Sequence, residues 1–361
     1  MENVRGARRE EYGVVRSILL EAFRSDDEAR LWDYLVLHDA ALKPEHVRLA
    51  LAGEQPVACT VLLPRTISTP RAPVAGAIVT LVACRPAYQR KGFGGATVKS
   101  TLQYMTDHGL SLGVLYGHPT YYPQFGFAPV MPKVLVSAQI DEFPTSDDTG
   151  LQPALPEDCE WMNSLYESQL GSCPCTTVRL TEPWMWQPRN QSKLQVFVTR
   201  DCSGYAFIEP SEDDMLVVRE ALCAPETEPS LLAALAHTAR KAAKSHLQLK
   251  MPPAYPLSRL LLALGGDVTI PPATSGMAAV TRWEAVLPKG FSVVGDGLHY
   301  DGRLVMQADN HTLVQLVCGY HGIDEVSQIA GVSIMPDADR DHLRSVFQRS
   351  YPKLYEAPFW F

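Results

Sequence analysis

The sequence predicts a mixed α/β fold that occurs twice along the chain and is followed by a smaller α+β segment. A length of 361 residues favours several hydrophobic cores over one. Helix-like and strand-like patterns alternate over residues 10–140, and a similar order begins again after a polar stretch at 141–156. We therefore expect three domains, at residues 1–148, 149–285 and 286–361.

The first region opens with two amphipathic helices and continues into a meander of strands. Apolar residues recur at helical spacing over 10–23, and a second helical pattern covers 29–38. Alternating apolar runs separated by turns predict antiparallel strands at 46–52, 57–67 and 74–84. The other elements expected there are a helix ending near His108, a strand at 111–116, a short helix or turn at 119–126 and a strand at 133–140.

The second region repeats part of this order. Its expected elements are a helix at 157–169, strands at 194–199, 205–208 and 215–222, a helix at 230–244 and a strand at 247–250. The segment before its second helix is acidic and lacks a glycine-rich turn, which indicates a copy without an anion site. The last region alternates strand signals with a helix at 339–349, and its aromatic end indicates a docked terminus.

Composition and charge exclude several classes of function. The chain carries 32 Lys and Arg against 40 Asp and Glu, and the acidic excess lies after residue 150. No basic stripe suited to nucleic acid, no membrane-spanning run and no signal peptide is visible, so we expect a cytoplasmic protein. The scattered cysteines do not form the pairs typical of metal sites, and we expect no metal. The acidity favours a cationic substrate, or it only maintains solubility.

The most informative stretch joins the strand at 74–84 to the next helix. Glycines at 92, 94 and 95 let the backbone approach a ligand, and the N–H groups of the turn and of the first helical turn would point at one spot. Arg90 and Lys91 add positive charge. A Walker loop and a dinucleotide fingerprint are excluded, because Val98 and Thr97 stand where those motifs need glycine. Phosphate is the expected ligand.

Two motifs in this region resemble a known family. The pattern Gln89-x-x-Gly92-x-Gly94 resembles the acetyl-CoA pyrophosphate loop of the GCN5-related N-acetyltransferase (GNAT) superfamily. The stretch 115–129 is similar to a Y-x-x-F-G-[FY] segment of the enhanced-intracellular-survival (Eis) type acetyltransferases. The resemblance implies an active GNAT domain, a degenerate second GNAT copy and a short C-terminal domain similar to sterol carriers. It also implies acetyl-CoA as cofactor and a hexameric homo-oligomer.

The resemblance assigns cofactor-binding residues around the glycine turn. The main chain of the strand end would pair with the pantetheine arm, and the turn would hold the pyrophosphate. Two residues after the next strand would lie near the reactive end of the cofactor. In that order, these residues are Val82, Ala83 and Cys84; Arg90, Lys91, Gly92, Phe93, Gly94 and Gly95; and Gly117 and His118.

The resemblance also implies two catalytic groups. Tyr122 matches the tyrosine that donates a proton to the leaving thiolate, and a phenol is protonated at neutral pH. Neighbouring Tyr121 is an alternative donor, and Tyr122 could instead be an aromatic packed against Phe125 and Phe127. The terminal carboxylate of Phe361 would take the proton from the incoming amine, directly or through water.

The sequence therefore predicts an acetyl-CoA-dependent N-acetyltransferase. Its acceptor would be a cationic or multi-amine small molecule or a peptide amine, attacking the thioester directly in a ternary complex. Asp26 and Trp32 are expected to line the acceptor pocket, unless the acidic segment after the first helix is only a solvated loop. Two alternatives stay open: a non-catalytic acetyl-CoA sensor or scaffold, and a lipid carrier that acts through its last domain.

Overall fold

The computed structural model describes residues 3–141, 143, 150–179, 194–271, 275–350 and 352. The chain forms two compact units. The first unit consists of Met1–Met131, Ser172–Val178 and Thr274–Leu354, and the second consists of Pro132–Gly171, Arg179–Ala273 and Tyr355–Phe361. No helix in the described part of the chain is long and apolar enough to cross a membrane.

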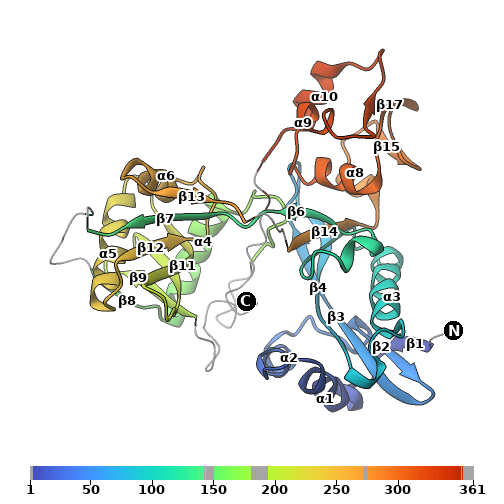
Figure 1. Ribbon diagram of the computed structural model, residues 1–361, viewed down its shortest axis with the longest axis horizontal. Helices are drawn as coiled ribbons and strands as arrows, with labels where there is room; N and C mark the ends of the chain where they lie inside the picture. The colour runs from blue at the N-terminus through green and yellow to red at the C-terminus, as the bar shows by residue number, and fades with distance from the viewer. Residues whose placement is uncertain are drawn as a thin grey trace. The chain divides into compact units, whose positions relative to one another are not determined.

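The first unit is built around a seven-stranded mixed sheet (Figure 1). Its strands lie in the order β1 (Asn3–Gly6), β2 (Val47–Ala52), β3 (Gln55–Ile67), β4 (Val74–Cys84), β5 (Leu112–Tyr116), β14 (Gly276–Val280) and β6 (Ala128–Met131). Only β4 and β5 are parallel, and all other neighbours are antiparallel. The sheet therefore contains the expected meander, together with a strand from much later in the chain.

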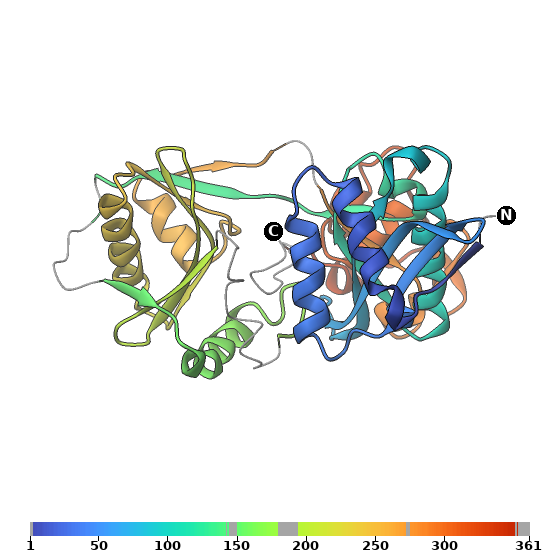
Figure 2. The ribbon, with the colours of Figure 1, turned by 90° about the horizontal axis from the view of Figure 1, so that it is seen from below.

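Helices cover both faces of this sheet. The helices α1 (Tyr12–Ala22) and α2 (Asp27–His38) lie side by side on one face (Figure 2), and α3 (Phe93–Asp107) lies on the other (Figure 1). Val15, Ile18 and Leu19 of α1 are fully buried, which is the helical spacing that the sequence showed. Short 3₁₀ helices connect these elements at η1 (Arg9–Glu11), η2 (Pro44–His46), η3 (Pro86–Tyr88) and η4 (Tyr122–Phe125).

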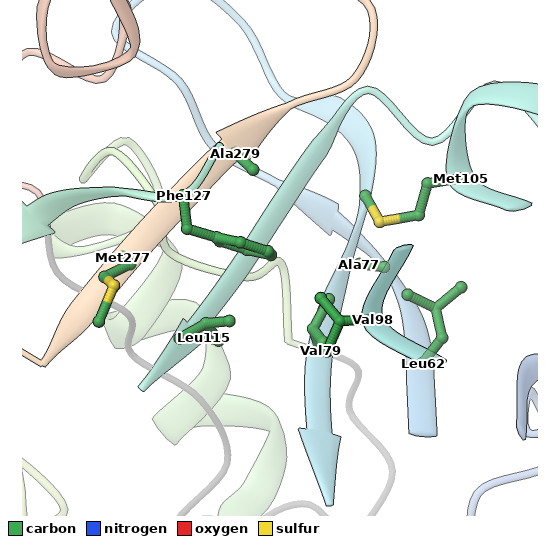
Figure 3. Packing of buried hydrophobic residues seen from close by; sticks show 9 residues of the cluster. All are labelled: Leu62, Ala77, Val79, Val98, Met105, Leu115, Phe127, Met277 and Ala279. Carbon is green, nitrogen blue, oxygen red and sulfur yellow. The ribbon is translucent and has the colours of Figure 1, made fainter. Parts of the chain in front are cut away.

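The core under α3 joins residues that are far apart in the sequence. Buried side chains from β3, β4, α3, β5 and β14 pack into one cluster with Phe127 (Figure 3). Its members are Leu62, Ala77, Val79, Val98, Met105, Leu115, Phe127, Met277 and Ala279. Tyr122 and Phe125 pack against it while remaining half-buried. This cluster is the base on which the η4 segment lies.

The rest of the first unit comes from the C-terminal part of the chain. A four-stranded antiparallel sheet contains β15 (Phe291–Val294), β16 (Gly297–Tyr300), β17 (Arg303–Gln307) and β18 (Ser333–Ile334). The helices of this part are α7 (Trp283–Val286), α8 (Asn310–Val317), α9 (Ile323–Val326) and α10 (Arg340–Val346). The helix α8 contacts β6 and β14 of the large sheet. The segment Ser172–Val178 extends β3 through the bridge between Ile67 and Thr177.

The second unit contains another seven-stranded sheet. Its strands lie in the order β13 (Asp267–Thr269), β7 (Leu135–Gln139), β12 (His246–Leu249), β11 (Met215–Cys223), β10 (Gly204–Glu209), β9 (Gln195–Thr199) and β8 (Leu151–Pro153). The helical elements are η5 (Pro156–Asp158), α4 (Cys159–Gln169), α5 (Glu228–Lys241) and α6 (Pro256–Ala263). Beside the sheet, Arg179 forms a buried two-bond ion pair with Glu220 of β11, with distances of 2.8 and 2.6 Å.

The two large sheets have the same topology, and each holds one strand from the other half of the chain. Read from β1 and from β8, each sheet has its fourth and fifth strands parallel and all other pairs antiparallel. The sixth position is occupied by β14 in the first sheet and by β7 in the second. The predicted repetition of a mixed α/β fold is confirmed, and the two copies have exchanged a strand.

Because of this exchange, neither large sheet is confined to one of the sequence ranges that we expected, with boundaries at 148 and 285. The strand predicted at 133–140 forms as β7 but pairs in the second sheet, and β14 from the expected second domain pairs in the first. The polar stretch at 141–156 is also not only a linker, because its described end contains β8, which pairs with β9. A strand pattern shows the alternation of faces but carries no information on which distant strand completes the hydrogen-bond ladder.

Candidate functional site

The site begins where β4 and β5 separate. The two strands pair only from Gly76 with Leu112 to Ile78 with Val114. Beyond this point β4 continues to Cys84 beside β3, and β5 continues to Tyr116 beside β14. Among the described residues, the edge of β4 from Val79 to Cys84 therefore has no strand partner on its β5 side. Main-chain groups on such an edge can pair with an extended ligand.

A bulge shapes this open edge. Leu81 has a left-handed backbone with φ of 48°, and the register with β3 shifts opposite it, between Cys59 and Val61. A bulge bends its strand and redirects the residues that follow. Those residues are Val82, Ala83 and Cys84, of which Ala83 is buried and the other two are half-buried. The predicted pantetheine-binding residues thus form the last part of the open edge.

The N-terminus of α3 follows this edge and is a candidate anion cradle. Gly92 is the N-cap residue, with φ of 92°, and no side chain in the described ranges caps the first turn. The N–H groups of Phe93, Gly94 and Gly95 therefore remain available at the positive end of a helix of 15 residues. Arg90, two residues before Gly92, also has a positive φ, of 60°.

The charged side chains at the cradle are exposed. Arg90 and Lys91 both face solvent. The Lys91 ammonium donates to the carbonyl of Ala87 at 2.9 Å and lies 5.5 Å from the centre of the Tyr88 ring. Within the described ranges, no three His, Cys, Asp or Glu side chains gather as a metal site requires. The cradle is therefore suited to a phosphate group held by backbone N–H groups and flanking positive charge.

The glycines of α3 allow an aromatic segment to pack onto the helix start. A Cβ atom at Gly94 would lie 3.2 Å from the Tyr121 hydroxyl, and one at Gly95 would lie 3.3 Å from the Phe125 ring. A larger residue at either position would push the η4 segment away from the helix. These two glycines therefore allow a close packing contact and also supply N–H groups to the cradle.

Tyr122 lies against the end of β5. A Cβ atom at Gly117 would be only 2.1 Å from the Tyr122 ring, so this contact requires glycine. The ring packs edge-on against Tyr121 and Phe127, with centroid distances of 5.1 and 5.9 Å. Burial, together with neighbouring Tyr121, raises the pKa of Tyr122 to about 12. Its hydroxyl has no hydrogen-bond partner among the described residues, and it stays protonated throughout the physiological pH range.

Comparison with known proteins identifies this arrangement. Residues 3–130 match the family model of the acetyltransferase (GNAT) domain. These residues form a GNAT acetyltransferase domain. The domain makes the protein an N-acetyltransferase, as the sequence predicted. The sequence matches no curated protein.

Solved structures share the fold of the whole chain at low sequence identity. A GCN5-related N-acetyltransferase from Anabaena variabilis has a TM-score of 0.74 at 15% identity, covering 99% of this chain and 100% of that one. Eis1 from Mycobacterium abscessus has a TM-score of 0.72 at 16% identity, covering 98% and 99%. A GCN5-related N-acetyltransferase from Kribbella flavida has a TM-score of 0.72 at 16% identity, covering 99% and 100%. The tandem GNAT architecture is thus confirmed as a fold.

The remaining predicted residues of the GNAT domain fall into different settings. Gly117 donates its N–H to Ser275 next to β14, at 2.8 Å. His118 is exposed, and its Nδ1 contacts the Thr120 hydroxyl at 3.0 Å within the same loop. Phe361 lies outside the described residues, so its predicted role stays a prediction.

The two expected acceptor-pocket residues differ from one another. Asp26 is exposed at the start of α2 and pairs with Arg30 one turn later. Trp32 is only 1% exposed; its Nε1 donates to the Tyr12 carbonyl at 3.1 Å, and its ring packs edge-on against Tyr12. The expectation that Trp32 lines a pocket is therefore wrong, because its ring is buried between α1 and α2, where it stabilises the helix pair.

Sequence reasoning missed two parts of the site. The first is the bulge at Leu81, which has no sequence signal because leucine rarely adopts a positive φ. The second is α8, from a distant part of the sequence, whose Asn310 and His311 side chains contact main-chain carbonyls at Gly126 and Pro123 of the η4 turn. No local pattern could connect segments so far apart in the chain.

Proposed function

We propose that the protein transfers the acetyl group of acetyl-CoA to amino groups of a cationic or multi-amine acceptor, by direct attack in a ternary complex. One observation carries this proposal: the open edge of β4 leads into the uncapped start of α3, and the η4 segment that carries Tyr122 packs against that helix start. Acetyl-CoA has an extended arm, an anionic pyrophosphate and a thiolate leaving group that needs a proton. A site for acetyl transfer must accommodate all three.

The described residues fit acetyl-CoA. The main chain of Val82–Cys84 would pair with the pantetheine arm, and the N–H groups of Gly92–Gly95 would bind the pyrophosphate, with Arg90 and Lys91 beside it. Gly117 and His118 would lie near the reactive end. When bound, acetyl-CoA supplies a thioester carbonyl for attack by an amine.

Tyr122 would act as the general acid. Its Oη would donate a proton to the departing sulfur, and burial keeps that proton in place because it raises the pKa to about 12. Tyr121 is less suited to this role. Its hydroxyl faces Gly94 in the cradle, where the pyrophosphate would bind, whereas Tyr122 lies beside Gly117. The terminal carboxylate of Phe361 would accept the proton of the amine. An α-carboxyl group ordinarily has a pKa of about 3.5, so such a carboxylate is a weak base suited to relay through water.

Charge supports a cationic acceptor. The first turn of α2 carries the exposed Asp27 and the half-buried Glu28, next to the exposed Asp26. The whole chain has a formal net charge of −8. Small-molecule amines and peptide amines both satisfy this chemistry. The cytoplasmic location and the oligomeric state remain expectations from the sequence and from the resemblance.

A thiol-release assay with acetyl-CoA and a panel of amines tests the proposal. Tyr122→Phe removes only the proton that is to be donated, so we expect kcat to fall by about 10²-fold or more. Tyr121→Phe is the matched control, because it removes the neighbouring hydroxyl and should change kcat by less than about threefold. A chain extended by a few residues past Phe361 should also lose turnover, since its carboxylate would be displaced.

Two results would overturn the proposal. Tight binding of acetyl-CoA without turnover on any amine would indicate a sensor. An equal loss of kcat in Tyr122→Phe and Tyr121→Phe would show that Tyr122 is not the general acid.

A further inference from the structure

The helix α8 belongs to the C-terminal part of the chain, yet it binds the segment that carries Tyr122. It begins after Asp309, whose carboxylate caps the Thr312 N–H at 2.8 Å, and it contacts β6 and β14 (Figure 1). It lies outside residues 3–130, which match the GNAT domain. Any influence of α8 on the site is therefore separate from the motifs of that domain.

Three side chains of α8 reach main-chain carbonyls of this segment. His311 Nε2 lies 3.1 Å from the Pro123 oxygen, and Asn310 Nδ2 donates to the Gly126 oxygen at 3.3 Å. Gln315 Nε2 donates to the Pro129 oxygen at 3.0 Å. Carbonyl oxygens only accept, so His311 must carry its hydrogen on Nε2 for this contact to form.

The His311 contact is the one next to Tyr122. Pro123 follows Tyr122 directly, and its carbonyl also accepts the Gly126 N–H at 3.0 Å, which closes the turn of η4. The Tyr122 hydroxyl has no hydrogen-bond partner in the described part of the chain. Its position therefore depends on ring packing and on the main chain at Tyr122–Pro123, where His311 is bound.

We propose that His311 is a positioning residue for Tyr122, so that the acetyl-transfer site in the GNAT domain is completed by the C-terminal helix α8. This proposal rests on the proposed function, in which Tyr122 is the general acid. Displacement of a reacting group by about 1 Å can lower a rate by about 10²-fold, which makes a single anchoring bond to its backbone consequential. Gln315 forms a bond of similar length to the same segment but at β6, away from Tyr122.

The test compares His311 with Gln315 by steady-state kinetics. We expect His311→Ala to lower kcat by about tenfold or more, with KM for acetyl-CoA within about twofold. His311→Gln supplies an amide N–H and should restore most of kcat. Gln315→Leu, the matched control, should stay within about twofold. His311→Phe keeps the ring shape without the donor and replaces His311→Ala if that variant does not fold.

A double-mutant cycle with Tyr122→Phe separates positioning from general loosening. If His311 acts through Tyr122, then His311→Ala lowers kcat no further in the Tyr122→Phe background. Additive losses, an unchanged kcat in His311→Ala, or equal losses in His311→Ala and Gln315→Leu would each overturn the proposal.

A readout without turnover distinguishes this inference from the proposed function. In protein labelled with 3-fluorotyrosine, the ¹⁹F resonance of Tyr122 is assigned by its loss in Tyr122→Phe. We expect it to shift or broaden in His311→Ala and to remain unchanged in Gln315→Leu. An unchanged resonance in His311→Ala overturns the positioning role. Inactivity of the wild type on every amine, with the resonance shifted as expected, overturns the proposed function instead.

Discussion

At the scale of single residues, Gly117 and Tyr122 depend on each other. The ring of Tyr122 occupies the space where any other residue at 117 would place its Cβ atom. The glycine therefore permits the close packing of the ring, whose burial raises the pKa of Tyr122. A single methyl group at this position would disturb both.

Gly117→Ala should therefore displace the Tyr122 ring. We expect kcat to fall at least tenfold and the protein to lose about 1–3 kcal/mol of stability, the usual effect of overpacking. Gly13→Ala in α1 is the control, because nothing lies within 4 Å of its added Cβ. Thermal unfolding and thiol release measure both effects. Gly117→Ala with wild-type kcat would contradict this reading of the contact.

The raised pKa of Tyr122 predicts the alkaline side of the pH profile. An acid donates only while protonated, and a pKa of about 12 keeps Tyr122 protonated at pH values well above the ordinary tyrosine pKa of about 10. We therefore expect kcat for a saturating amine to rise with pH as the amine loses its proton, without falling up to about pH 10.5. A fall with an apparent pKa near 10 in the wild type would show that the acid is not buried in this way.

The resemblance assigned the local part of the candidate site, and sequence reasoning missed the tertiary part. Val82–Cys84 and Arg90–Gly95 lie within 14 positions of one another in the chain, so the motifs that carry the resemblance reach both; their role in binding stays a prediction. Trp32 was misassigned, because an aromatic residue near acidic ones carries no sign of which face of the helix is buried. The contact of His311 with Pro123 was out of reach, because it depends on how the C-terminal part packs on the sheet.

At the scale of elements, the start of α3 performs two tasks. Its N–H groups form the cradle, and its glycines admit the η4 segment. The cradle and the Tyr122 segment are therefore linked through one turn of helix. A change at this turn should affect both cofactor affinity and the placement of the aromatic segment.

Gly94→Asp should weaken CoA binding at least tenfold. It brings a negative charge to the anion cradle and places a side chain against the Tyr121 hydroxyl, 3.2 Å from the new Cβ. Gln103→Ala, on the exposed face of the same helix, should leave Kd within about twofold. Isothermal titration with CoA measures both values, and equal affinity of Gly94→Asp and wild type would remove the cradle from the binding site.

At the scale of the whole molecule, the two seven-stranded sheets share a topology, but we expect only the first to bind the cofactor. The strands β11 and β12 also separate, pairing only from Met215 to Val218 of β11. Beyond that point the sulfur of Met251 accepts the Ala221 N–H at 3.2 Å. The following helix α5 begins with Glu228 and has a proline in its first turn. In the described part of the second copy, Met251 therefore occupies the β11 edge at Ala221, and α5 starts without a glycine turn.

This difference predicts a binding stoichiometry of one CoA per chain. Calorimetric titration of the wild type should give one site, and Gly94→Asp should weaken that same site. Two sites per chain, or one site unaffected by Gly94→Asp, would show that the second copy binds the cofactor.

Much of the fold could be predicted from the sequence, and the limits have physical causes. The strand at 74–84 is predicted and observed with the same bounds, because strong alternation ends at Arg85-Pro86. The strands β1 and β6 were missed, since each spans only four residues and carries little periodicity. The helix α8 was missed because its pattern is short and its apolar face packs on a sheet from another part of the sequence.

The exchange of β7 and β14 also determines when the first sheet can be completed during synthesis of the chain. The strand β5 leaves the ribosome early, but its neighbour β14 ends only at Val280. At about 5–20 residues per second, the nascent first sheet waits roughly ten seconds or longer with β5 uncovered. An uncovered edge recruits strands of other chains, so the delay invites chaperone binding and mispairing between polysomal neighbours. Slowed elongation should therefore lower the yield of native protein more than its length alone suggests.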